Sequence, residues 1–434
     1  MRRRWRRGEG QAGCAAGWAV AFALVCVAAQ PGLAEGRGEI SSLLRVGTSG
    51  DYAPFSAGRG GSDSALDGFD IAVARAYAEE RGRTLAFVRF RWPYLLRDLG
   101  AEKFDVAMSG ITVRPERSAA GRFTIPVVES GAVLLVDQSS SWRNASDANS
   151  RKVRIGVNAG GHLERVAQAH FPEAVLVSIP ENRAVLRALV GYRVDAAVSD
   201  SLEAPKWLSE APGFKAIGPF TLDRKAYLVH ADLPGLARDL DRWLLERERD
   251  GTLARLREHH LGIGESGGEP LATPLRSLLA SMDERLSLMP LVGAFKRRNG
   301  LPLEVPEREK AVLEAAVAGV RAAARSRGTD VPPEKRIRAL FRAQMEAAKQ
   351  VQWSSVRAEE IATSAPLPDL TTALRPALLR LGERIAERIL ALPQNLDAAV
   401  VERVARQELR TRHLSPASRI ALAESVVALS RSRQ

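Results

Sequence analysis

Two kinds of hydrophobic pattern follow one another along the chain. From residue 43 to about 262, short runs rich in β-branched residues alternate with segments of helical period; examples are LLRVGTS, LAFVRF, VRIGVNA and VDAAVSD against FDIAVARAYAEERG and NRAVLRALVGYR. Strands that alternate with helices are typical of α/β folds in which the sheets are largely parallel. The pattern therefore predicts an α/β domain over residues 43–262.

The pattern changes after residue 262. GIGESGGEPLATP is rich in Gly, Pro and Ser, and it predicts a linker at 263–274. From 275 to 434 nearly every segment has helical period, and proline and glycine stand at the joints. The second part is therefore expected to be all-α. A chain of 434 residues is long enough for two such unlike domains, each with its own core.

The first 34 residues have the composition of an export signal. Five arginines precede an uncharged run from Gln11 to Gln30, and small residues follow. This order is typical of a secretory signal, with cleavage expected after Ala34; for the alternative, a membrane anchor, the apolar core is short. We therefore expect a periplasmic protein without a stable anchor. Both cysteines, Cys14 and Cys26, fall in this segment, which leaves the mature chain without a disulfide or a thiol nucleophile.

The charge of the chain bears on its partners. The formal net charge of +12 would fall to +8 on loss of residues 1–34, which hold five arginines and one glutamate. The surplus is mostly arginine interleaved with glutamate, as in LGERIAERIL, and this is typical of a solvated helix face. Because no stripe of basic and aromatic residues is present, nucleic acid is not an expected partner. Part of the surplus suits small anionic molecules, and the oligomeric state is left open.

Several motifs of the first domain carry a family resemblance. VGTSGDYAPFS, FDVAMSGITVRPERSAAGRFTIP and VRIGVNAGGHLERV make residues 43–262 similar to the two-lobed periplasmic amino-acid-binding proteins. The resemblance implies one lobe at 43–136 plus 226–262, another at 137–225, and a ligand in the cleft between them. It also implies that the chain crosses between the lobes near Leu135 to Asp137 and near Lys225 to Val229.

The same resemblance implies a set of ligand contacts. Arg117 is expected to bind a carboxylate, since a guanidinium group offers two parallel donors. Gly110 and Thr112 would add further donors, and Asp200 stands where amino-acid binders hold the ligand's ammonium group. Arg114 is a local competitor of Arg117, but we interpret it as a surface arginine.

A narrower resemblance is to the periplasmic cyclohexadienyl dehydratases. It is carried by GTSGDYAPFS, RWPYLLRDL, GGHLE, SDSLEA and RKAYL, and Trp92 and Lys225 lie in the motifs that differ from ordinary transport binders. The resemblance implies conversion of prephenate to phenylpyruvate, or of arogenate to phenylalanine, and the preference between the two stays open. Such a reaction removes a ring hydroxyl group together with carbon dioxide, so it needs an acid but no metal or cofactor.

Glu164 is the residue that we expect to be this acid, because it matches the proposed general acid of that family. Tyr52 and Trp92 would flank the substrate ring, and Lys225 would contact the substrate. A glutamate at a helix start is more often a surface residue that complements the helix dipole. His162 departs from the family pattern, which suggests an altered anion contact or substrate preference.

The all-α part holds a different set of candidate residues. A helix bundle with inward cations and little acid–base machinery suits a rearrangement that polarises its transition state without moving a proton. From Leu275 onward the chain resembles the exported, all-helical chorismate mutases, with DERLSLMPLVGAFKRRNGLPLE matching their opening. Pro290 is expected to split this segment into two helices.

The mutase resemblance assigns a role to six side chains. Arg285, Arg308 and Arg375 would bind the substrate carboxylates, Lys296 and Gln352 would meet the breaking ether oxygen, and Glu309 would bind the ring hydroxyl group. Val305 and Ala348 depart from the family pattern. Any single exposed lysine or arginine is more often a solvated surface residue, and the spacing of the whole set is what favours a site.

Together, the two resemblances predict a bifunctional exported enzyme. It would convert chorismate to prephenate in the second domain and prephenate to phenylpyruvate in the first, two steps towards phenylalanine. The alternative is a periplasmic binding protein for an amino acid or aromatic acid that carries a helical accessory domain. Glu164 and Trp92 separate these hypotheses, since a binding protein needs Arg117 and Asp200 but no acid.

Overall fold

The protein is described by a computed structural model that covers residues 42–58, 65–263, 273–359, 361 and 366–431. The predicted signal at 1–34 and nearly all of the predicted linker lie outside the described residues. Within them, no helix is both long and apolar enough to span a membrane.

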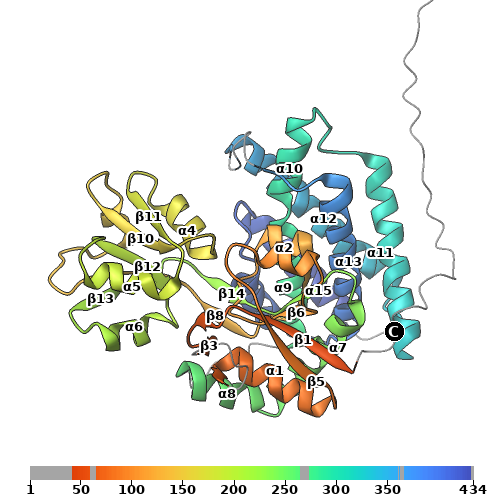
Figure 1. Cartoon of the computed structure of the whole chain (residues 1–434). Coiled ribbons are helices and arrows are strands. Elements are labelled where there is room, and N and C mark those ends of the chain that lie inside the picture. The colour runs from red at the N-terminus through yellow and green to blue at the C-terminus, as the bar shows by residue number, and fades with distance from the viewer. Residues whose placement is uncertain (1–41, 59–64, 264–272, 360, 362–365, 432–434) are drawn as a thin grey trace, which may run out of the picture. The chain divides into compact units, whose positions relative to one another are not determined.

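The first lobe is built on a five-stranded sheet with strand order β5-β1-β6-β15-β7 (Figure 1). β1 runs parallel to β5 and β6, whereas β15 runs antiparallel to β6 and β7. One face is covered by α1, α7 and α8, and the other by α2. The elements of this lobe are β1 (Leu43–Thr48), β2 (Asp51–Tyr52), β3 (Ser56–Gly58), β4 (Leu66–Asp67), α1 (Phe69–Glu80), β5 (Thr84–Arg89), α2 (Leu95–Gly100), β6 (Val106–Ala107), α3 (Pro115–Ala120), β7 (Gly121–Phe123), β15 (Leu228–His230), α7 (Pro234–Arg249) and α8 (Thr252–Leu261).

The second lobe repeats this plan with strand order β11-β10-β12-β9-β13. α4 covers one face of the sheet, and α5 and α6 cover the other. Its elements are β9 (Ala132–Asp137), the 3₁₀ turn η2 (Ala145–Ala148), β10 (Arg154–Asn158), α4 (His162–His170), β11 (Val175–Ile179), α5 (Asn182–Val190), β12 (Ala196–Asp200), α6 (Ala204–Glu210) and β13 (Phe214–Ile217). The prediction of a two-lobed α/β domain is confirmed.

Two short strands join the lobes. β8 (Val128–Ser130) leads directly into β9, and β14 (Asp223–Lys225) follows β13 and precedes β15. They pair with each other as an antiparallel ribbon. We call this pair the hinge ribbon.

The hinge ribbon corrects two details of the sequence analysis. The crossing expected at Leu135 to Asp137 is wrong, because those residues belong to β9 and pair with β12 and β13 inside the second sheet. The first lobe therefore ends near residue 131 instead of 136. The second crossing, expected near Lys225 to Val229, lies slightly earlier, at β14 (Asp223–Lys225), and Ala226 and Tyr227 separate β14 from β15. The sheets are also less parallel than expected, since strands that return from the other lobe enter them in the opposite direction.

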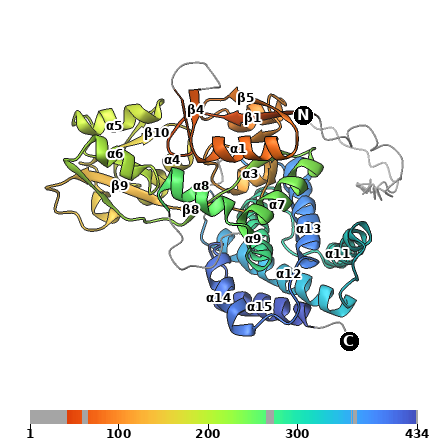
Figure 2. The same ribbon diagram turned by 90° about the horizontal axis from the view of Figure 1, so that it is seen from below.

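The second domain is all-α in its described residues, as predicted. Its elements are α9 (Pro274–Ser287), α10 (Met289–Arg298), α11 (Pro306–Arg327), α12 (Glu334–Arg357), the π-helical turn η3 (Leu370–Leu374), α13 (Arg375–Ile389), α14 (Ala398–Glu408) and α15 (Pro416–Ser430). α15 packs against both α12 and α14 (Figure 2). Pro290 separates α9 from α10 as expected, with the break at Leu288.

Local sequence explains several of these helix ends. The side chains of Thr273, Asp397 and Ser415 accept hydrogen bonds from backbone N–H groups of the first turns of α9, α14 and α15, which satisfies donors that a helix leaves free. α11 ends at Gly328, whose φ of 62° lies in the left-handed region that favours glycine. α9 is buried on almost every side. Its polar side chains therefore contact protein groups of both domains instead of solvent.

Candidate functional site

The cleft between the lobes holds a small cavity of about 40 Å³. By the same measure one water molecule needs about 10–15 Å³, so the lobes as they stand leave room for a few waters and not for a substituted ring. A substrate can therefore reach this site only when the lobes separate. The cavity is lined by Asp51, Tyr52, Trp92, Gly110, Thr112, Arg117, Asn158, Gly161, His162, Leu163, Asn182 and Lys225.

Six of the predicted residues thus line one cavity, and Arg117 is central among them. Its side chain is buried on α3 and donates from Nη1 to the backbone oxygen of Thr112 at 2.9 Å. The guanidinium carbon lies 5.2 Å from the centre of the Trp92 ring. In the described part of the chain Arg117 forms no ion pair, and burial together with the charge of Arg114 holds its pKa well below the usual value. A buried, unneutralised guanidinium group is well suited to an anionic ligand.

Arg114 is not the surface arginine that we expected. Only 11% of its side chain is exposed, and burial lowers its pKa to about 10. Its Nε and Nη1 atoms are buried without a hydrogen-bond partner. The nearest carboxylate oxygen, on Glu116, is 3.8 Å away. Arg114 therefore adds a second incompletely neutralised cation beside Arg117.

Lys225 and Asp200 form a buried ion pair at the wall of the cleft. The lysine Nζ lies 2.9 Å from Asp200 Oδ2 and donates to Thr112 Oγ1 at 2.9 Å. Asp200 also accepts hydrogen bonds from Ser130 Oγ and from the backbone N–H of Leu202, and it has no exposed surface. Because Lys225 already neutralises this carboxylate, the geometry does not present Asp200 to a ligand ammonium group.

His162, which also lines the cavity, lies close to a carboxylate of the hinge ribbon. Its Nε2 atom lies 3.0 Å from Asp223 Oδ2. Burial lowers the pKa of the imidazole, whereas Asp223 acts to raise it. The departure from the family pattern at this position is therefore a group that pairs with the hinge ribbon.

Glu164 does not line the cavity. One carboxylate oxygen accepts a hydrogen bond from the backbone N–H of Gly160 at 2.6 Å, and the other accepts from Ser178 Oγ. Both oxygens are thus occupied by neighbours on the second lobe. This arrangement resembles a carboxylate that stabilises the first turn of α4.

A residue that the sequence analysis did not select, Glu203, has the properties expected of an acid. It is 1% exposed and precedes α6. Its carboxyl group accepts from Ser199 Oγ at 2.9 Å and from Asn182 Nδ2 at 2.5 Å, and Asn182 lines the cavity. Burial, with smaller contributions from Asp200 and Asp51, raises its pKa to about 8. The available signal was its place in SDSLEA, just after a buried strand, because ligands of α/β folds bind at the carboxyl ends of strands.

In the helical domain, the predicted cations Lys296, Arg308 and Arg375 come from α10, α11 and α13 and lie close enough to interact. Burial and the charges of Arg308 and Arg375 lower the pKa of Lys296, while Glu309 acts to raise it. Burial and Arg375 likewise lower the pKa of Arg308, although much of that side chain is exposed. Lys296 Nζ donates to the backbone oxygen of Leu303 at 2.7 Å.

Arg285 and Gln352 are the more buried members of the predicted mutase set. Burial lowers the pKa of Arg285 to about 10, and its Nη1 atom has no hydrogen-bond partner. Gln352 is 7% exposed; its Nε2 atom contacts Met289 Sδ and Ala348 O at 3.4 Å each, and its Oε1 atom is buried and unpartnered. The structure does not show a direct contact between Arg285 and the other cations.

The remaining mutase positions are more ordinary. Glu309 Oε2 lies 3.3 Å from Lys349 Nζ, so this carboxylate is already paired. Val305 stands at the N-terminal cap of α11 and offers no side-chain hydrogen bond there. Among the described residues no cluster of three or more His, Cys, Asp or Glu side chains is arranged to hold a metal ion.

Comparison with known proteins matches the two domains separately. Residues 44–263 match the bacterial extracellular solute-binding proteins, family 3. Residues 276–353 match chorismate mutase type II. The first match covers half of the chain, and the chain belongs to that solute-binding protein family. It also carries a chorismate mutase type II segment, so the fusion and the fold of both parts are as predicted.

Individual relatives match the first domain. Cyclohexadienyl dehydratase of Pseudomonas aeruginosa is 33% identical over 226 residues, which are 51% of this chain and 83% of that protein. The ABC transporter arginine-binding protein 1 of Escherichia coli is 25% identical over 219 residues, 49% of this chain and 88% of that protein. Among solved structures, an ancestral amino acid-binding protein described as a precursor of cyclohexadienyl dehydratase is 30% identical, covers 51% of this chain and 96% of its own, and has a TM-score of 0.48.

Proposed function

We propose that this protein is a bifunctional enzyme that converts chorismate to prephenate and prephenate to phenylpyruvate. The observation that carries the proposal is the presence in one chain of a chorismate mutase type II segment and a domain related to a cyclohexadienyl dehydratase. The product of the first reaction is the substrate of the second. Prephenate is accordingly the substrate we propose for the cleft, with arogenate as a second substrate to be compared.

The helical domain would act on chorismate by placement and charge. Arg285, Arg308 and Arg375 bind the two carboxylates and hold the compact conformer, in which the new carbon–carbon bond can form as the ether bond breaks. Lys296 and Gln352 donate to the ether oxygen as it becomes negative. An amide can donate at any pH, so Gln352 needs no prior protonation. Burial and the charges of Arg308 and Arg375 lower the pKa of Lys296, and burial and the charge of Arg375 lower the pKa of Arg308; this supports the arrangement, because a bound dianion would offset the repulsion among the cations.

The cleft would act on prephenate by binding one carboxylate and protonating the leaving hydroxyl group. Arg117, with Arg114 behind it, binds the carboxylate of the pyruvyl side chain, and Trp92 and Tyr52 flank the ring. The carbon–oxygen bond breaks as the hydroxyl group takes a proton and leaves as water. The electrons of the ring carboxylate's carbon–carbon bond enter the ring, carbon dioxide departs, and an aromatic ring remains.

We propose Glu203, and not Glu164, as the source of that proton. A carboxyl group with a pKa of about 8 is protonated at neutral pH and can therefore donate. Both carboxyl groups accept two hydrogen bonds, but Glu203 is buried and is joined to the cavity wall through Asn182, whereas Glu164 is partly exposed and is held by Gly160 and Ser178. Burial of the side chain is the main cause of this raised pKa.

We also propose that the protein is exported to the periplasm by residues 1–34. The proposal rests on the composition of that segment and on the extracellular solute-binding family to which the chain belongs. N-terminal sequencing of the protein from a periplasmic extract should begin at Glu35. An N-terminus at Met1 in the cytoplasmic fraction would contradict export.

The decisive experiment is to supply purified full-length protein with chorismate and to follow phenylpyruvate by its alkaline absorbance. Wild type should form phenylpyruvate, Lys296→Ala should leave chorismate unchanged, and Glu203→Gln should accumulate prephenate. Formation of prephenate alone by the wild type would restrict the activity to the helical domain. Tight binding of an amino acid without turnover would favour the alternative function, a periplasmic binding protein, for which the arginine-binding relative argues.

A further inference from the structure

The hinge ribbon has two faces with different neighbours. In its register Asp223 lies opposite Ser130, Arg224 opposite Glu129, and Lys225 opposite Val128. Successive side chains of a strand point to opposite faces. Asp223, Lys225 and Ser130 should therefore share one face, and Arg224 and Glu129 the other.

The first face holds the groups of the substrate cleft. Asp223 pairs with His162, and Lys225 pairs with Asp200. Ser130 Oγ donates to the same carboxylate of Asp200 at 2.9 Å. Every polar side chain on this face of the ribbon thus orients a group of the second lobe.

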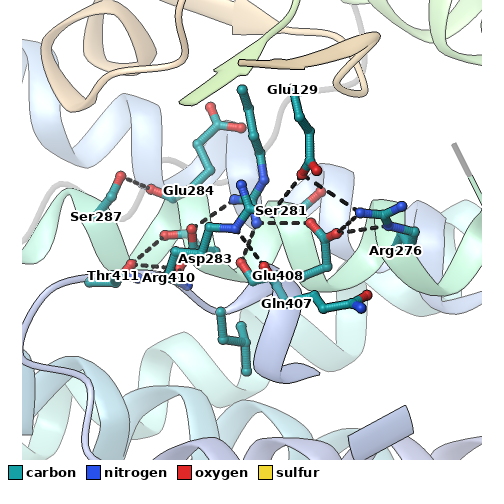
Figure 3. Close-up of polar contacts among 12 residues, drawn as sticks. Glu129, Arg276, Ser281, Asp283, Glu284, Ser287, Gln407, Glu408, Arg410 and Thr411 are labelled. Carbon is teal, nitrogen blue, oxygen red and sulfur yellow. Dashed lines mark hydrogen bonds and ion pairs between the residues drawn. The ribbon is translucent and has the colours of Figure 1, made fainter. Parts of the chain in front are cut away.

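The second face is held by the helical domain. Arg224 Nη1 lies 2.9 Å from Asp283 Oδ2 on α9, and its Nη2 lies 2.8 Å from Glu408 Oε2 on α14. Glu129, on the opposite strand, lies 2.5 Å from Arg410 Nη2. Figure 3 shows the network that these residues form. Arg410 contacts both Glu129 and Asp283, and Arg276 lies between Glu129 and Glu408.

These ion pairs are shielded from water. The side chains of Arg224 and Asp283 are each 9% exposed, and that of Glu408 is 3% exposed. Asp283 is fixed further by the backbone N–H groups of Arg410 and Thr411, both at 2.7 Å. Loss of one partner from such a network leaves a buried charge uncompensated, so the network resists displacement of the ribbon.

The ribbon is also where the lobes must hinge. Both of its strands run from one lobe to the other, and domain closure is absorbed by a few residues in such crossings. The cavity of about 40 Å³ is too small to admit the substrate unless the lobes open. The helical domain is therefore bound by ion pairs to the hinge ribbon, the part of the first domain that must move when the cleft opens and closes.

We propose that Arg224 is a positioning residue for the dehydration. Held by Asp283 and Glu408 of the helical domain, it fixes β14 so that Asp223 and Lys225 keep His162 and Asp200 in place as the cleft closes. This inference rests on the proposed dehydratase function of the cleft. In it, the helical domain has two roles: it catalyses its own reaction, and it positions residues of the first domain's site.

The test compares Arg224→Gln with Arg388→Gln in the full chain. Arg388 is a matched control: it is a buried arginine of the helical domain that lines the same cavity as Arg224, but it pairs with Asp241 of the first lobe at 2.7 Å and not with a residue of the ribbon. Arg224→Gln should lower kcat/KM for prephenate at least about tenfold, mainly through kcat, and Arg388→Gln should change it less than about threefold. Mutase kcat/KM with chorismate should stay near the wild-type value in both.

A second readout does not depend on turnover. The imidazole of His162 is influenced by Asp223, Lys225 and Arg114. In Arg224→Gln the contact with Asp223 should loosen, so the pKa of His162 measured by NMR should fall below its wild-type value, whereas Arg388→Gln should leave it in place. Glu129→Gln, on the other strand of the ribbon, should reproduce the effects if Arg224→Gln fails to fold.

The outcomes separate this inference from the proposed function. Wild-type protein that does not convert prephenate would refute the dehydratase function, and the His162 titration would still report on the ribbon. Equal losses in the Arg224 and Arg388 variants, or a parallel loss of both activities, would assign Arg224 a merely structural role and overturn the inference. So would an unchanged His162 titration together with unchanged dehydration.

Discussion

At the scale of single residues, the two glutamates of the second lobe allow a direct comparison. Glu203 is fully buried with a pKa of about 8, whereas Glu164 is partly exposed and fully hydrogen-bonded. Glu203→Gln should lower kcat for prephenate dehydration about 10²–10⁴-fold, the usual contribution of a general acid. Glu164→Gln should stay close to the wild type. Steady-state rates of phenylpyruvate formation decide between them, and the reverse order would restore Glu164 as the acid.

The same carboxyl group should make stability depend on pH. The pKa of Glu203 is raised from 4.5 to about 8 on folding, so between these values the unfolded chain has lost a proton that the folded chain keeps. Stability from this group is full below about pH 4.5 and is lost as pH rises towards 8. Glu203→Gln should therefore gain stability relative to the wild type as pH rises from 5 to 8. Urea unfolding of both proteins at pH 5 and pH 8 measures the difference in their free energies of unfolding. A stability advantage of the variant that shrinks as pH rises would contradict a raised pKa at Glu203.

Among the cations of the helical domain, Lys296 gives the sharpest prediction. Lys296→Ala should lower chorismate mutase kcat about 10²–10³-fold, because it removes a donor from the oxygen that becomes negative. Lys310→Ala is the matched control, since Lys310 is an exposed lysine of the neighbouring helix α11. Initial rates of chorismate consumption by the two variants and the wild type would show the contrast. Equal effects of the two substitutions would place the site elsewhere.

Candidate site residues could be predicted from the sequence only where they lie in a recognisable motif. Arg117, Trp92 and Thr112 were selected from their motifs, and the fold brings all three to one cavity; their contact with a substrate stays a prediction. Arg114 was misjudged, since nothing in SGITVRPER reveals that its side chain is buried. Glu203 was missed because its pKa depends on burial beneath Asn182, which lies 21 positions away in the sequence.

At the scale of elements, the close approach of the lobes depends on the turn before α4. Gly160 has a φ of 73°, and a Cβ atom there would lie 2.4 Å from Pro93 Cβ, on the other lobe. An ion pair between Arg165 and Glu116, at 2.8 Å, bridges the lobes beside it. A side chain at position 160 would hold the lobes apart.

Gly160→Ala should therefore weaken dehydration on the order of 10²-fold in kcat/KM, since small misplacements of this kind are expensive for catalysis. Gly82→Ala is the control for backbone strain, because Gly82 has a φ of 60° but open space around it. Both variants should lose some stability, and only Gly160→Ala should lose activity with prephenate. Similar activities in the two would mean that closure does not need this contact.

Elements were predicted well where a hydrophobic pattern was long. β1, β5, β10 and β12 overlap runs that were read as strands, and the described residues after 274 are mainly helical, as their period predicted. The hinge ribbon could not be predicted in this way. β8 and β14 have three residues each, and every residue of β14 is buried, so the sequence of β14 shows no alternation of apolar and polar positions. The direction of a strand in these mixed sheets depends on whether the chain enters the sheet from the same lobe or from the other one. The sequence of the strand itself carries no information about this.

At the scale of the whole molecule, the contact between the two domains could not be predicted. Arg224 meets Asp283 across 59 positions and Arg410 meets Glu129 across 281, and each residue taken alone resembles a solvated surface charge. On α13, Arg380 and Arg384 donate to backbone oxygens near β7, and Arg388 pairs with Asp241 of α7. The arginine surplus that the sequence analysis placed on a solvated face therefore serves in part to join the domains.

Because so many buried charges link the domains, the described chain should unfold in one cooperative step. A stable dicarboxylate analogue of chorismate at 100 times its Kd stabilises its site by about 2.7 kcal/mol. If unfolding is cooperative, the single calorimetric transition should rise by roughly 3 °C for a chain of this length, and amide exchange in β14 should slow together with that in α10. Lys296→Ala should abolish both effects at the same concentration of analogue. Two transitions, of which only one moves with the analogue, would show that the domains unfold independently and that the buried ion pairs between them contribute little.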